Sequence, residues 1–396
     1  MPPDLTAMAE RASALWPETC HGRWMSEECE RGLVSVIIPT YNRAHLVTEA
    51  MDSVWAQPYR PIELIIVDDG STDDTREVVE KWGKKCAVDG AFELRYFHQE
   101  NKGCPASRNL GLIESRGEFI QHLDSDDLML PCKLADSVPI LERAGEVSWV
   151  YGSFLEDRDG VIVQRSSPDV GRAPELETVA SRNMPPPLPL WRRRLAVLVG
   201  PWEESFRERA DDWDLHMRAI PLIQTAVNLH EPVCTIRIHC NGRLSDQCWS
   251  QEALAECLRA WRRAFQVARH HGREAKGLLE VYEWHALLRA VQATGAGYAS
   301  EARRHLREAM ELQPFTFRGR MLAVLIRVAG LVPLCLYRPT YGAARAFVHR
   351  IRKEEPCSLG RTGRRRYQRY PDAGERLGKR SLLSGIRTAA LPAGKR

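Results

Sequence analysis

Four short apolar runs alternate with helical stretches between residues 33 and 127, and this alternation constrains the possible folds most strongly. The runs, each followed by polar residues, read SVIIPTYN, IELIIVDDG, FELRYFHQEN and FIQHLDSDD. Near-continuous apolar strands separated by helices of about 10–15 residues are typical of a mostly parallel sheet with helices on both faces. Because such sheets bind ligands beyond the carboxyl ends of their strands, we expect the four polar strand ends to converge on one crevice.

The remaining chain divides into a looser α/β part and a helical part. Beyond the fourth run we predict a helix that begins near residue 210 and three further strands, at 148–154, 161–165 and 233–239. From Ser250 the spacing of apolar residues predicts three successive helices. The predicted segments are an N-terminal leader (1–32), an α/β domain (33–249), a helical C-terminal region (250–345) and a basic tail expected to be disordered (346–396).

Charge is distributed unevenly along the 396 residues. From residue 351 to the end there are thirteen Lys and Arg against four Asp and Glu, which gives this tail a net charge of +9. Because the whole chain has a net charge of +4, residues 1–350 have a net charge of −5. No aromatic interleaving or recognition fold supports nucleic acid as a partner. An anionic membrane surface is the partner that we expect, at roughly 1 kcal/mol per cation near the surface.

The sequence shows no export signal and no complete membrane span. Its N-terminus lacks a basic-then-apolar layout, and its eleven cysteines form no CxxC pair, so we expect reduced thiols in the cytoplasm. The most apolar stretch, Met321–Tyr337, is interrupted by Arg327 and Pro333 and makes a poor lone span. We predict a cytoplasmic protein that associates peripherally with the inner face of the plasma membrane.

Three carboxylates lie within four positions at the end of the fourth run, at Asp124, Asp126 and Asp127. Neighbouring like charges are costly unless a cation lies among them. Either the segment is a solvated loop in which Asp127 caps the next helix, or Asp124 and Asp126 form a DxD motif shared by a divalent cation and a sugar hydroxyl. Mg²⁺ and Mn²⁺ favour carboxylates together with phosphate oxygens. The triplet alone leaves both interpretations open.

Two other strand ends also admit two interpretations. In VDDGSTDDT a turn and a helix cap account for Gly70, Ser71 and Thr72, whereas Asp68 and Asp69 lie unusually close to an apolar strand. In NKGCPASRNLG a helix start with basic neighbours suits anionic oxygens. A glycine turn followed by a helix with an exposed arginine explains the second segment equally well.

The order and spacing of the motifs decide between these interpretations. SVIIPTYNR, VDDGSTDDT, NKGCPASRNLG, FIQHLDSDD and GPWEESFRERADDWDLHMR follow one another, and RIHCNGRLS closes the series. From Leu33 to Ser245 the series resembles the family 2 glycosyltransferases. The resemblance implies a GT-A fold, which is a Rossmann-like, mostly parallel mixed sheet flanked by helices. It also implies an enzyme that uses nucleotide-diphosphate sugars with Mg²⁺ or Mn²⁺. The helical region is expected as an appendage outside the resemblance.

Carried over position by position, the resemblance implies roles for individual residues. Asp212 would be the general base, Asp126 would ligate the metal, and Asp124 would meet the ribose. The acceptor or pyrophosphate region would comprise Asp211, which stands where the family usually has Glu, together with Trp213 and His239. The residues expected to bind the nucleotide sugar are Thr40, Tyr41, Asn42, Arg43, Asp68, Asp69, Lys102, Arg108, Asp124 and Ser125.

These roles imply an inverting transfer, because one base near the reacting carbon suffices for a single in-line displacement. We expect a UDP- or GDP-sugar donor and a saccharide, lipid-linked or protein hydroxyl as acceptor, in the synthesis of a cell-surface polysaccharide or related glycan. Two other classes compete with this interpretation. One is a non-catalytic nucleotide-sugar-binding module. The other is a nucleotidyltransferase, which would need a Gly-rich phosphate loop where TYNRAHL has no glycine.

Overall fold

A computed structural model describes most of the chain between residues 25 and 315. The described residues are 25–86, 89–144, 148–165, 184–206, 210–223, 225–238, 251–270, 276–295, 297–312 and 314–315. They all lie in the first of two compact units, Met1–Tyr337, and not in the second, Arg338–Arg396. Most of the predicted leader, the apolar stretch Met321–Tyr337 and the basic tail therefore lie outside the described residues.

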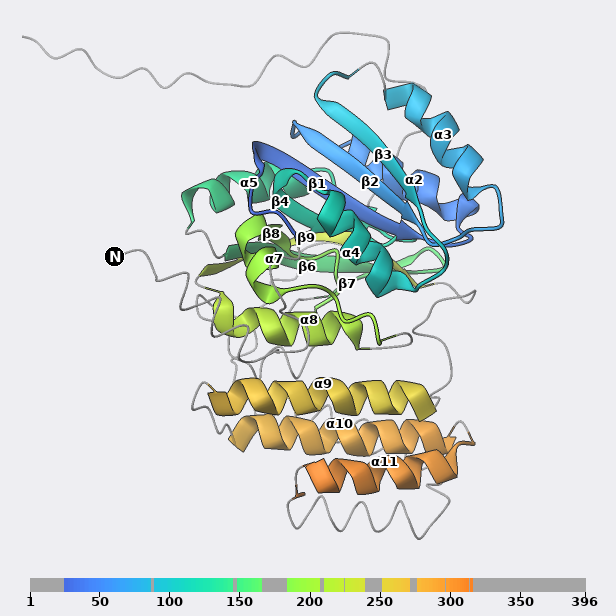
Figure 1. The fold of residues 1–396 in the computed structure, drawn as a ribbon, viewed down its shortest axis with the longest axis vertical. Coiled ribbons are helices and arrows are strands. Elements are labelled where there is room, and N and C mark those ends of the chain that lie inside the picture. Colours follow the sequence, from blue (N-terminus) through green and yellow to red (C-terminus); the bar gives the residue numbers. More distant parts are fainter. Residues whose placement is uncertain are drawn as a thin grey trace, which may run out of the picture. The chain divides into compact units, whose positions relative to one another are not determined.

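One mixed sheet forms the centre of the α/β part (Figure 1). Its described strands are β1 (Glu30–Thr40), β2 (Ile62–Asp68), β3 (Phe92–His98), β4 (Gly117–His122), β5 (Leu128–Met129), β6 (Ser148–Arg158), β7 (Val161–Arg165), β8 (Leu190–Arg192) and β9 (Thr225–Ile238). The order is β3-β2-β1-β4-β8-β6-β9-β5, with β7 paired to β6. β1 to β4 are parallel, and β8 runs antiparallel to both β4 and β6. The parallel half therefore turns all four motif-bearing strand ends toward one edge.

Helices cover both faces of this sheet. Those of the α/β part are α2 (Ala44–Trp55), α3 (Thr75–Cys86), α4 (Cys104–Glu114), α5 (Lys133–Arg143), α7 (Arg193–Val199) and α8 (Asp211–Ala219), followed by the 3-10 turn η1 (Ile220–Leu222). Alternation along β1 assigns the faces, because successive side chains point to opposite sides of a strand. Ile38 lies in one core cluster with Met51 of α2, whereas Ile37 lies in the other with Leu112 of α4 and Leu215 of α8.

Helix α4 approaches β1 closely because Gly111 faces the strand. A Cβ atom at this position would lie 2.4 Å from Cγ2 of Ile37, closer than carbon atoms can approach. The start of α4 lies beside the end of β2, where the N–H of Gly103 donates to Asp69. Gly111 helps to set where the side chains of α4 reach the polar edge.

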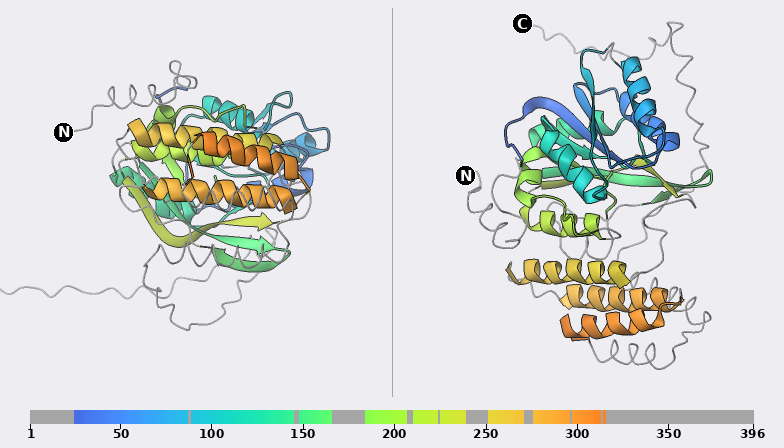
Figure 2. Two further views of the ribbon diagram at one scale, coloured as in Figure 1. Left: turned by 90° about the horizontal axis from the view of Figure 1, so that it is seen from below. Right: turned by 45° about the vertical axis from the view of Figure 1, so that its right-hand side comes forward.

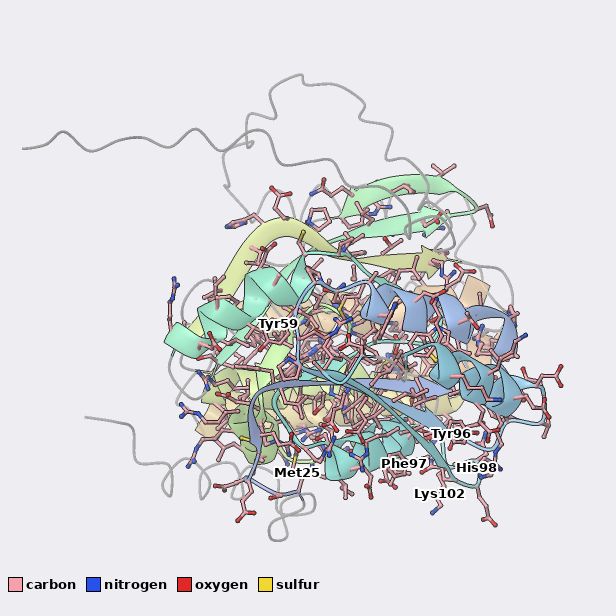
Figure 3. The ribbon with its side chains drawn as sticks, turned by 90° about the horizontal axis from the view of Figure 1, so that it is seen from above. Met25, Tyr59, Tyr96, Phe97, His98 and Lys102 are labelled. Carbon is pink, nitrogen blue, oxygen red and sulfur yellow. The ribbon has the colours of Figure 1, made fainter. Side chains whose placement is uncertain are left out.

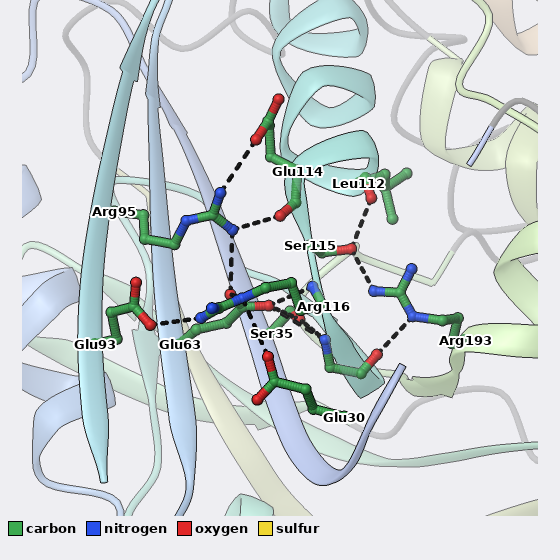
Figure 4. A network of polar contacts seen from close by, with 11 residues as sticks. Glu30, Ser35, Glu63, Glu93, Arg95, Leu112, Glu114, Ser115, Arg116 and Arg193 are labelled. Atoms are coloured by element: carbon green, nitrogen blue, oxygen red, sulfur yellow. Dashed lines mark hydrogen bonds and ion pairs between the residues drawn. The ribbon is translucent and has the colours of Figure 1, made fainter. Parts of the chain in front are cut away.

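A buried polar network fixes the opposite edge of the parallel strands (Figure 4). Glu63 of β2 is fully buried and accepts hydrogen bonds from Ser35 Oγ (2.5 Å), the Arg116 N–H (2.6 Å) and Arg116 Nε (3.1 Å). Arg95 Nη1 lies 3.3 Å from the same carboxylate. These contacts satisfy the charge of Glu63 and tie β1, β2, β3 and the start of β4 together.

The helical region consists of α9 (Gln251–His270), α10 (Lys276–Gly295) and α11 (Ala299–Leu312), which lie side by side (Figure 2). Tyr282 of α10 lies edge-on to Trp261 of α9 and donates a hydrogen bond to the Ala309 carbonyl of α11 (2.5 Å). The apolar residues of α9 belong to the same core cluster as those of α4 and α8. None of the described helices is long and apolar enough to cross a bilayer.

The α/β class, the four strand–helix units and the three C-terminal helices agree with the sequence prediction. The sequence did not reveal β8 or α7, which together span LWRRRLAVLV. Three successive arginines suggest exposure there, yet Arg193 is buried and donates to the Gly117 carbonyl (2.7 Å) and to Ser115 Oγ (2.8 Å). Partners far along the chain thus allow a charged residue to face the core. The proposed domain boundaries stay predictions.

Candidate active site

Hydrogen bonds hold the loop after β1 against the loop after β2. Asn42 has a φ angle of 51°, in the left-handed region that Asn adopts more readily than most residues. Its N–H donates to Ser71 Oγ (2.8 Å), and its Oδ1 accepts from the Thr72 N–H (2.8 Å). The N–H of Arg43 donates to Thr75 Oγ1 (3.2 Å). Two of the expected donor-binding residues therefore also shape the loops that carry them.

Thr40 and Tyr41 differ in exposure at the end of β1. Thr40 is buried, and its Oγ1 has no hydrogen-bond partner within the part of the chain that the structure describes. Buried hydroxyls normally have one, so this oxygen is free to bind a ligand. Tyr41 is 46% exposed. An exposed aromatic ring beside such a hydroxyl is suited to stacking on a base.

Asp68 links the end of β2 to β3. It is buried and accepts hydrogen bonds from the Ser71 N–H (2.8 Å) and from the hydroxyl of Tyr96 (2.6 Å). Burial of the phenol and the charge of Asp68 both raise the pKa of Tyr96, so the hydroxyl remains a donor. Figure 3 places Tyr96 and His98 of β3 near Lys102, at the same edge of the sheet.

Asp69 fixes the loop between β3 and α4. Its Oδ1 accepts from Gln99 Nε2 (2.7 Å) and from the Lys102 N–H (2.9 Å), while its Oδ2 accepts from the Gly103 N–H (2.8 Å). The N–H of Asp69 in turn donates to the Thr40 carbonyl (2.9 Å). The side chain and the backbone N–H of Asp69 together therefore set the relative positions of three of the four strand ends that carry the motifs.

Arg108 of α4 joins two acidic segments that are far apart in the sequence. Its Nη2 lies 2.8 Å from Oδ1 of Asp124, beyond β4, and its Nη1 lies 2.6 Å from Oδ2 of Asp211, at the start of α8. The guanidinium carbon lies 4.3 Å from the ring centroid of Trp202, a cation–π distance. The side chain of Arg108 is only 6% exposed. This arginine is thus a buried cation between the DxD strand end and the acid pair.

The neighbouring residue, Asn109, anchors the segment that carries Trp202. Its Nδ2 donates to the Trp202 carbonyl (2.9 Å) and to Oε1 of Glu204 (2.9 Å), and its Oδ1 accepts from the Trp202 N–H (2.8 Å). Asn109 therefore holds residues 200–202, the GPW segment, while Arg108 holds Asp211, the first residue of the acid pair Asp211-Asp212. Neither contact follows from the local sequence pattern.

Charge balance around Arg108 is reflected in the pKa values of its neighbours. Burial raises the pKa of Asp124, Arg108 partly lowers it, and the nearby charge of Asp126 raises it again, so that the pKa lies above its usual range. Burial acts to lower the pKa of Arg108, but the adjacent acidic groups outweigh burial and raise it. Arg108 therefore remains charged, whereas Asp124 lacks full compensation for its negative charge.

Asp126 and Asp127 lie in a turn after β4 and are both mostly buried, as is Ser125. The Asp127 N–H donates to the Asp124 carbonyl (3.0 Å), which closes the turn. The expected helix cap at Asp127 is wrong. Its Oδ1 accepts from the Arg237 N–H of β9 (3.0 Å), and α5 begins after Cys132. Arg237 also binds the Asp126 carbonyl through Nε.

The acid pair forms the first turn of α8, where the helix dipole favours negative charge. Asp211 turns toward Arg108, as described above, and Asp212 follows it with partial exposure. The indole of Trp213 is buried and lies 4.8 Å from the ring of Trp261 in α9. Its expected contact with an acceptor stays a prediction. His239 lies outside the described residues.

Asp124 and Asp126 fit a divalent cation that arrives with a diphosphate. Among the described residues no group of three or more His, Cys, Asp or Glu side chains could hold a metal ion by itself. Mg²⁺ bound to a phosphorylated substrate needs only one or two protein carboxylates, because phosphate oxygens and waters complete its shell. Burial and the nearby charge of Asp126 raise the pKa of Asp124, so a bound cation would favour its charged form.

Sequence reasoning missed a layer of aromatic and histidine side chains around Arg108. The ring of His122 lies edge-on to Trp202 at 5.2 Å, and that of His216 stacks on Trp191 at 5.9 Å. Burial and the charge of Arg108 lower the pKa of both histidines, that of His216 to about 3, so both are neutral at pH 7. The sequence offered one signal for this layer: the motif GPWEESFRERADDWDLHMR, which contains GPW and WDLHM, is rich in aromatic residues.

Comparison with known proteins agrees with this geometry. The family model described as glycosyl transferase family 2 matches residues 35–186. Residues 35–186 therefore resemble a family 2 glycosyltransferase domain. The chain is 38% identical over 141 residues to an uncharacterized glycosyltransferase of Rickettsia bellii, covering 35% of this chain and 19% of the relative. It is 34% identical over 130 residues to GalNAc(5)-diNAcBac-PP-undecaprenol beta-1,3-glucosyltransferase of Campylobacter jejuni, covering 32% of this chain and 40% of the relative.

Solved structures share the fold of this chain. TarS of S. aureus, residues 1–349 in complex with UDP-GlcNAc, superposes with a TM-score of 0.52 at 19% identity, covering 75% of this chain and 88% of that one. The same protein in complex with UDP gives a TM-score of 0.53 at 20% identity, with 74% and 87% covered. At this identity the likeness establishes the GT-A fold. The chain spans about a fifth to two fifths of the length of the curated relatives that it matches.

Proposed function

We propose that this protein is a glycosyltransferase that moves a sugar from a UDP- or GDP-sugar to a hydroxyl group. The transfer would invert the configuration at the anomeric carbon of that sugar. The acceptor would be a saccharide, a lipid-linked saccharide or a protein in the synthesis of cell-surface glycans. The observation that carries the proposal is the buried Arg108 bridge, which joins the DxD strand end at Asp124 to the acid pair at Asp211. It brings the segment proposed for the donor and the segment proposed for the base to one place.

The donor side of the proposed site consists of the ends of β1 to β4. The unpartnered hydroxyl of Thr40 and the exposed ring of Tyr41 would bind the nucleoside. Asp68 and Asp69 would keep the surrounding loops in place and offer their remaining acceptor capacity to the base edge. Lys102 follows in the loop that Asp69 fixes and would face the diphosphate. The proposed roles of Asn42 and Arg43 are to hold the same pocket wall.

The charge of the donor would be balanced by two sources. Arg108 supplies a permanent cation next to Asp124. Asp126, together with Asp124, would hold Mg²⁺ or Mn²⁺, and such a metal supplies Lewis-acid stabilisation of the leaving diphosphate. Ser125 lies between the two carboxylates in sequence, on the turn that the bond from the Asp127 N–H to the Asp124 carbonyl closes. This arrangement accounts for clustered acids at the end of a buried strand.

The acceptor side needs a base, and we assign that role to Asp212. Its carboxylate would take the proton of the acceptor hydroxyl as the oxygen bonds to the anomeric carbon. The bond from that carbon to the diphosphate breaks at the same time, and the nucleotide diphosphate leaves with the electron pair. Attack on the face opposite the leaving group inverts the anomeric centre. A positioned base of this kind contributes about 10²–10⁴-fold to the rate.

The proposal includes association with an anionic membrane surface through the basic residues after 351. The support is the +9 charge of this tail and the apolar stretch Met321–Tyr337 before it. The Campylobacter jejuni relative is named for an undecaprenol-linked substrate, which makes a membrane-borne acceptor a reasonable first choice. A chain that ends before residue 351 should lose binding to vesicles that contain anionic lipid. Equal binding of the full and shortened chains contradicts this part.

The enzymatic proposal is tested with a panel of UDP-GlcNAc, UDP-glucose and GDP-mannose, each with Mn²⁺ or Mg²⁺, scored by release of nucleotide diphosphate. Asp212→Asn should reduce turnover about 10²–10⁴-fold while UDP binding is retained. Asp126→Ala should weaken the metal-dependent part of donor binding. The matched control is Asp136→Asn, an exposed acid in α5, which should leave both quantities unchanged. A fully active Asp212→Asn enzyme removes the assignment of the base.

A further inference from the structure

Helix α9 of the helical region contacts α8 and the segment that carries Trp202, on which Arg108 stacks. Arg263 makes these contacts. Its Nη1 lies 3.2 Å and 3.3 Å from the two carboxylate oxygens of Asp214 in α8, and its Nη2 lies 2.5 Å from Oε2 of Glu203. The side chains of Arg263 and Glu203 are each 17% exposed, and that of Asp214 is fully buried. A largely dehydrated guanidinium with two carboxylate partners holds both of them in a defined geometry.

The contact with Asp214 belongs to a larger buried network. Arg218, also in α8, donates from Nε to Oδ2 of Asp214 (3.0 Å), and both side chains are fully buried. Its remaining nitrogens donate to the carbonyls of Val199 (2.7 Å) and Pro201 (2.9 Å). The network therefore ties the end of α7, the GPW segment, α8 and α9 into one unit.

We propose that Arg263 is a positioning residue for glycosyl transfer, and that the helical region serves to fix the acceptor side of the site. This inference builds on the proposed function of Asp212. Asp214 lies on the same short helix, two residues after Asp212. Contacts that fix the position of Asp214 therefore also fix the position of the proposed base. Glu203 directly follows Trp202, on which Arg108 stacks.

Three features of α8 favour stabilisation by contacts from another helix. The helix has nine residues and is preceded by Ala210 with a φ of 65°, in the left-handed region, which is strained for alanine. No side chain of the described residues caps its first turn through the N-cap position. Short helices owe most of their stability to tertiary packing rather than to propensity. The Trp213–Trp261 contact and the Arg263 bridge supply that packing from α9.

The inference predicts separate effects on donor binding and on turnover. The contacts of Arg263 described above are with α8 and the GPW segment, whereas the donor is proposed to bind at the ends of β1 to β4. Arg263→Gln should therefore leave the Kd for UDP with Mn²⁺ within about twofold of wild type. It should lower kcat for nucleotide-diphosphate release by about 10- to 100-fold, because small misplacements of reacting groups cost that much. Arg263→Lys, which keeps a cation, should recover part of the loss.

A readout that does not need turnover accompanies the kinetics. Hydrogen exchange followed by mass spectrometry should show faster exchange of the α8 amides in Arg263→Gln than in wild type. The control is Arg304→Gln in α11, whose side chain is half exposed and pairs with Glu308 one turn away. It should change neither exchange in α8 nor kcat. All assays are run on the full chain at temperatures where circular dichroism shows every variant folded.

The outcomes distinguish failure of the inference from failure of the proposed function. Unchanged exchange in α8 or unchanged kcat in Arg263→Gln overturns the positioning role. Equal losses in UDP affinity and kcat also overturn it, because they indicate a general structural defect. If the wild-type protein releases no nucleotide diphosphate from any donor, the proposed function fails, and exchange in α8 alone then decides whether α9 braces this helix.

Discussion

Removal of the Arg108 guanidinium should destabilise the domain by an amount that the structure allows to be estimated. Arg108→Gln leaves the carboxylates of Asp124 and Asp211 facing each other across a buried position. Breaking a buried ion pair by removing one partner costs about 3–5 kcal/mol. Because the two carboxylate side chains are 28% and 22% exposed, solvent compensates part of the loss. We expect the low end of the range, about 3 kcal/mol, including the lost contact with Trp202.

The loss of unfolding free energy in Arg108→Gln should depend on pH in a defined direction. Burial and Asp126 raise the pKa of Asp124 while Arg108 lowers it, so Arg108→Gln raises this pKa further above the unfolded value of about 3.9. The folded variant then binds a proton more tightly than the unfolded chain. Its free energy of unfolding falls as pH rises through the folded pKa. The difference between wild type and variant is therefore largest near neutral pH and shrinks on acidification.

Urea unfolding followed by tryptophan fluorescence, at pH 7 and at about pH 5.5, measures both effects. Arg108→Lys keeps the charge but not the two-pronged geometry and should lie between wild type and Arg108→Gln. The matched control is Arg76→Gln, whose side chain is 65% exposed and pairs with Glu80 on the surface of α3. It should stay within about 0.5 kcal/mol of wild type. A loss below about 1 kcal/mol for Arg108→Gln at pH 7, or the same loss at both pH values, refutes the reasoning.

Three further substitutions probe other parts of the framework. Glu63→Gln should cost about 3–5 kcal/mol in urea unfolding, because it removes a buried charge bonded to Arg116. Burial acts to raise the pKa of Glu63, but its hydrogen bonds lower it overall, so its contribution is present above about pH 4.3 and is lost as pH falls through the folded pKa. Gly111→Ala should lower the thermal stability by about 1–3 kcal/mol through the clash with Ile37. Asp69→Asn should cost about 1–3 kcal/mol and weaken UDP binding in a calorimetric titration, because an amide cannot accept all three loop donors.

Matched substitutions give these predictions their controls. Glu80→Gln and Asp74→Asn change exposed acids on or next to α3, and each should stay within about 0.5 kcal/mol of wild type. Gly90→Ala places a methyl group where no atom lies within 4 Å and should likewise be neutral. A neutral Gly111→Ala would show that α4 is free to move away from β1. If a test variant and its control lose the same free energy of unfolding, the stabilising role of the corresponding contact is contradicted.

The sequence by itself determined the architecture of the parallel half. Its strands and helices follow from local periodicity, and their polar ends reach one edge because parallel strands share a direction. The motif order was sufficient to indicate the family and the segments of the candidate site. These features were predictable because each depends on residues within about ten positions of one another, as in the run from Phe119 to Asp127.

Only the tertiary structure decided how these segments are connected. Arg108 lies 16 residues before Asp124 and 103 residues before Asp211, and no local pattern specifies that one guanidinium bridges both. Asp127 bonds to a strand 110 residues later instead of capping a helix. Arg193 can face the core because oxygen atoms of Gly117 and Ser115, far away in the sequence, accept its hydrogen bonds. Charged side chains can be exposed, paired or buried with equal local sequence, and the choice is made by whichever partners the folded chain brings within hydrogen-bond distance.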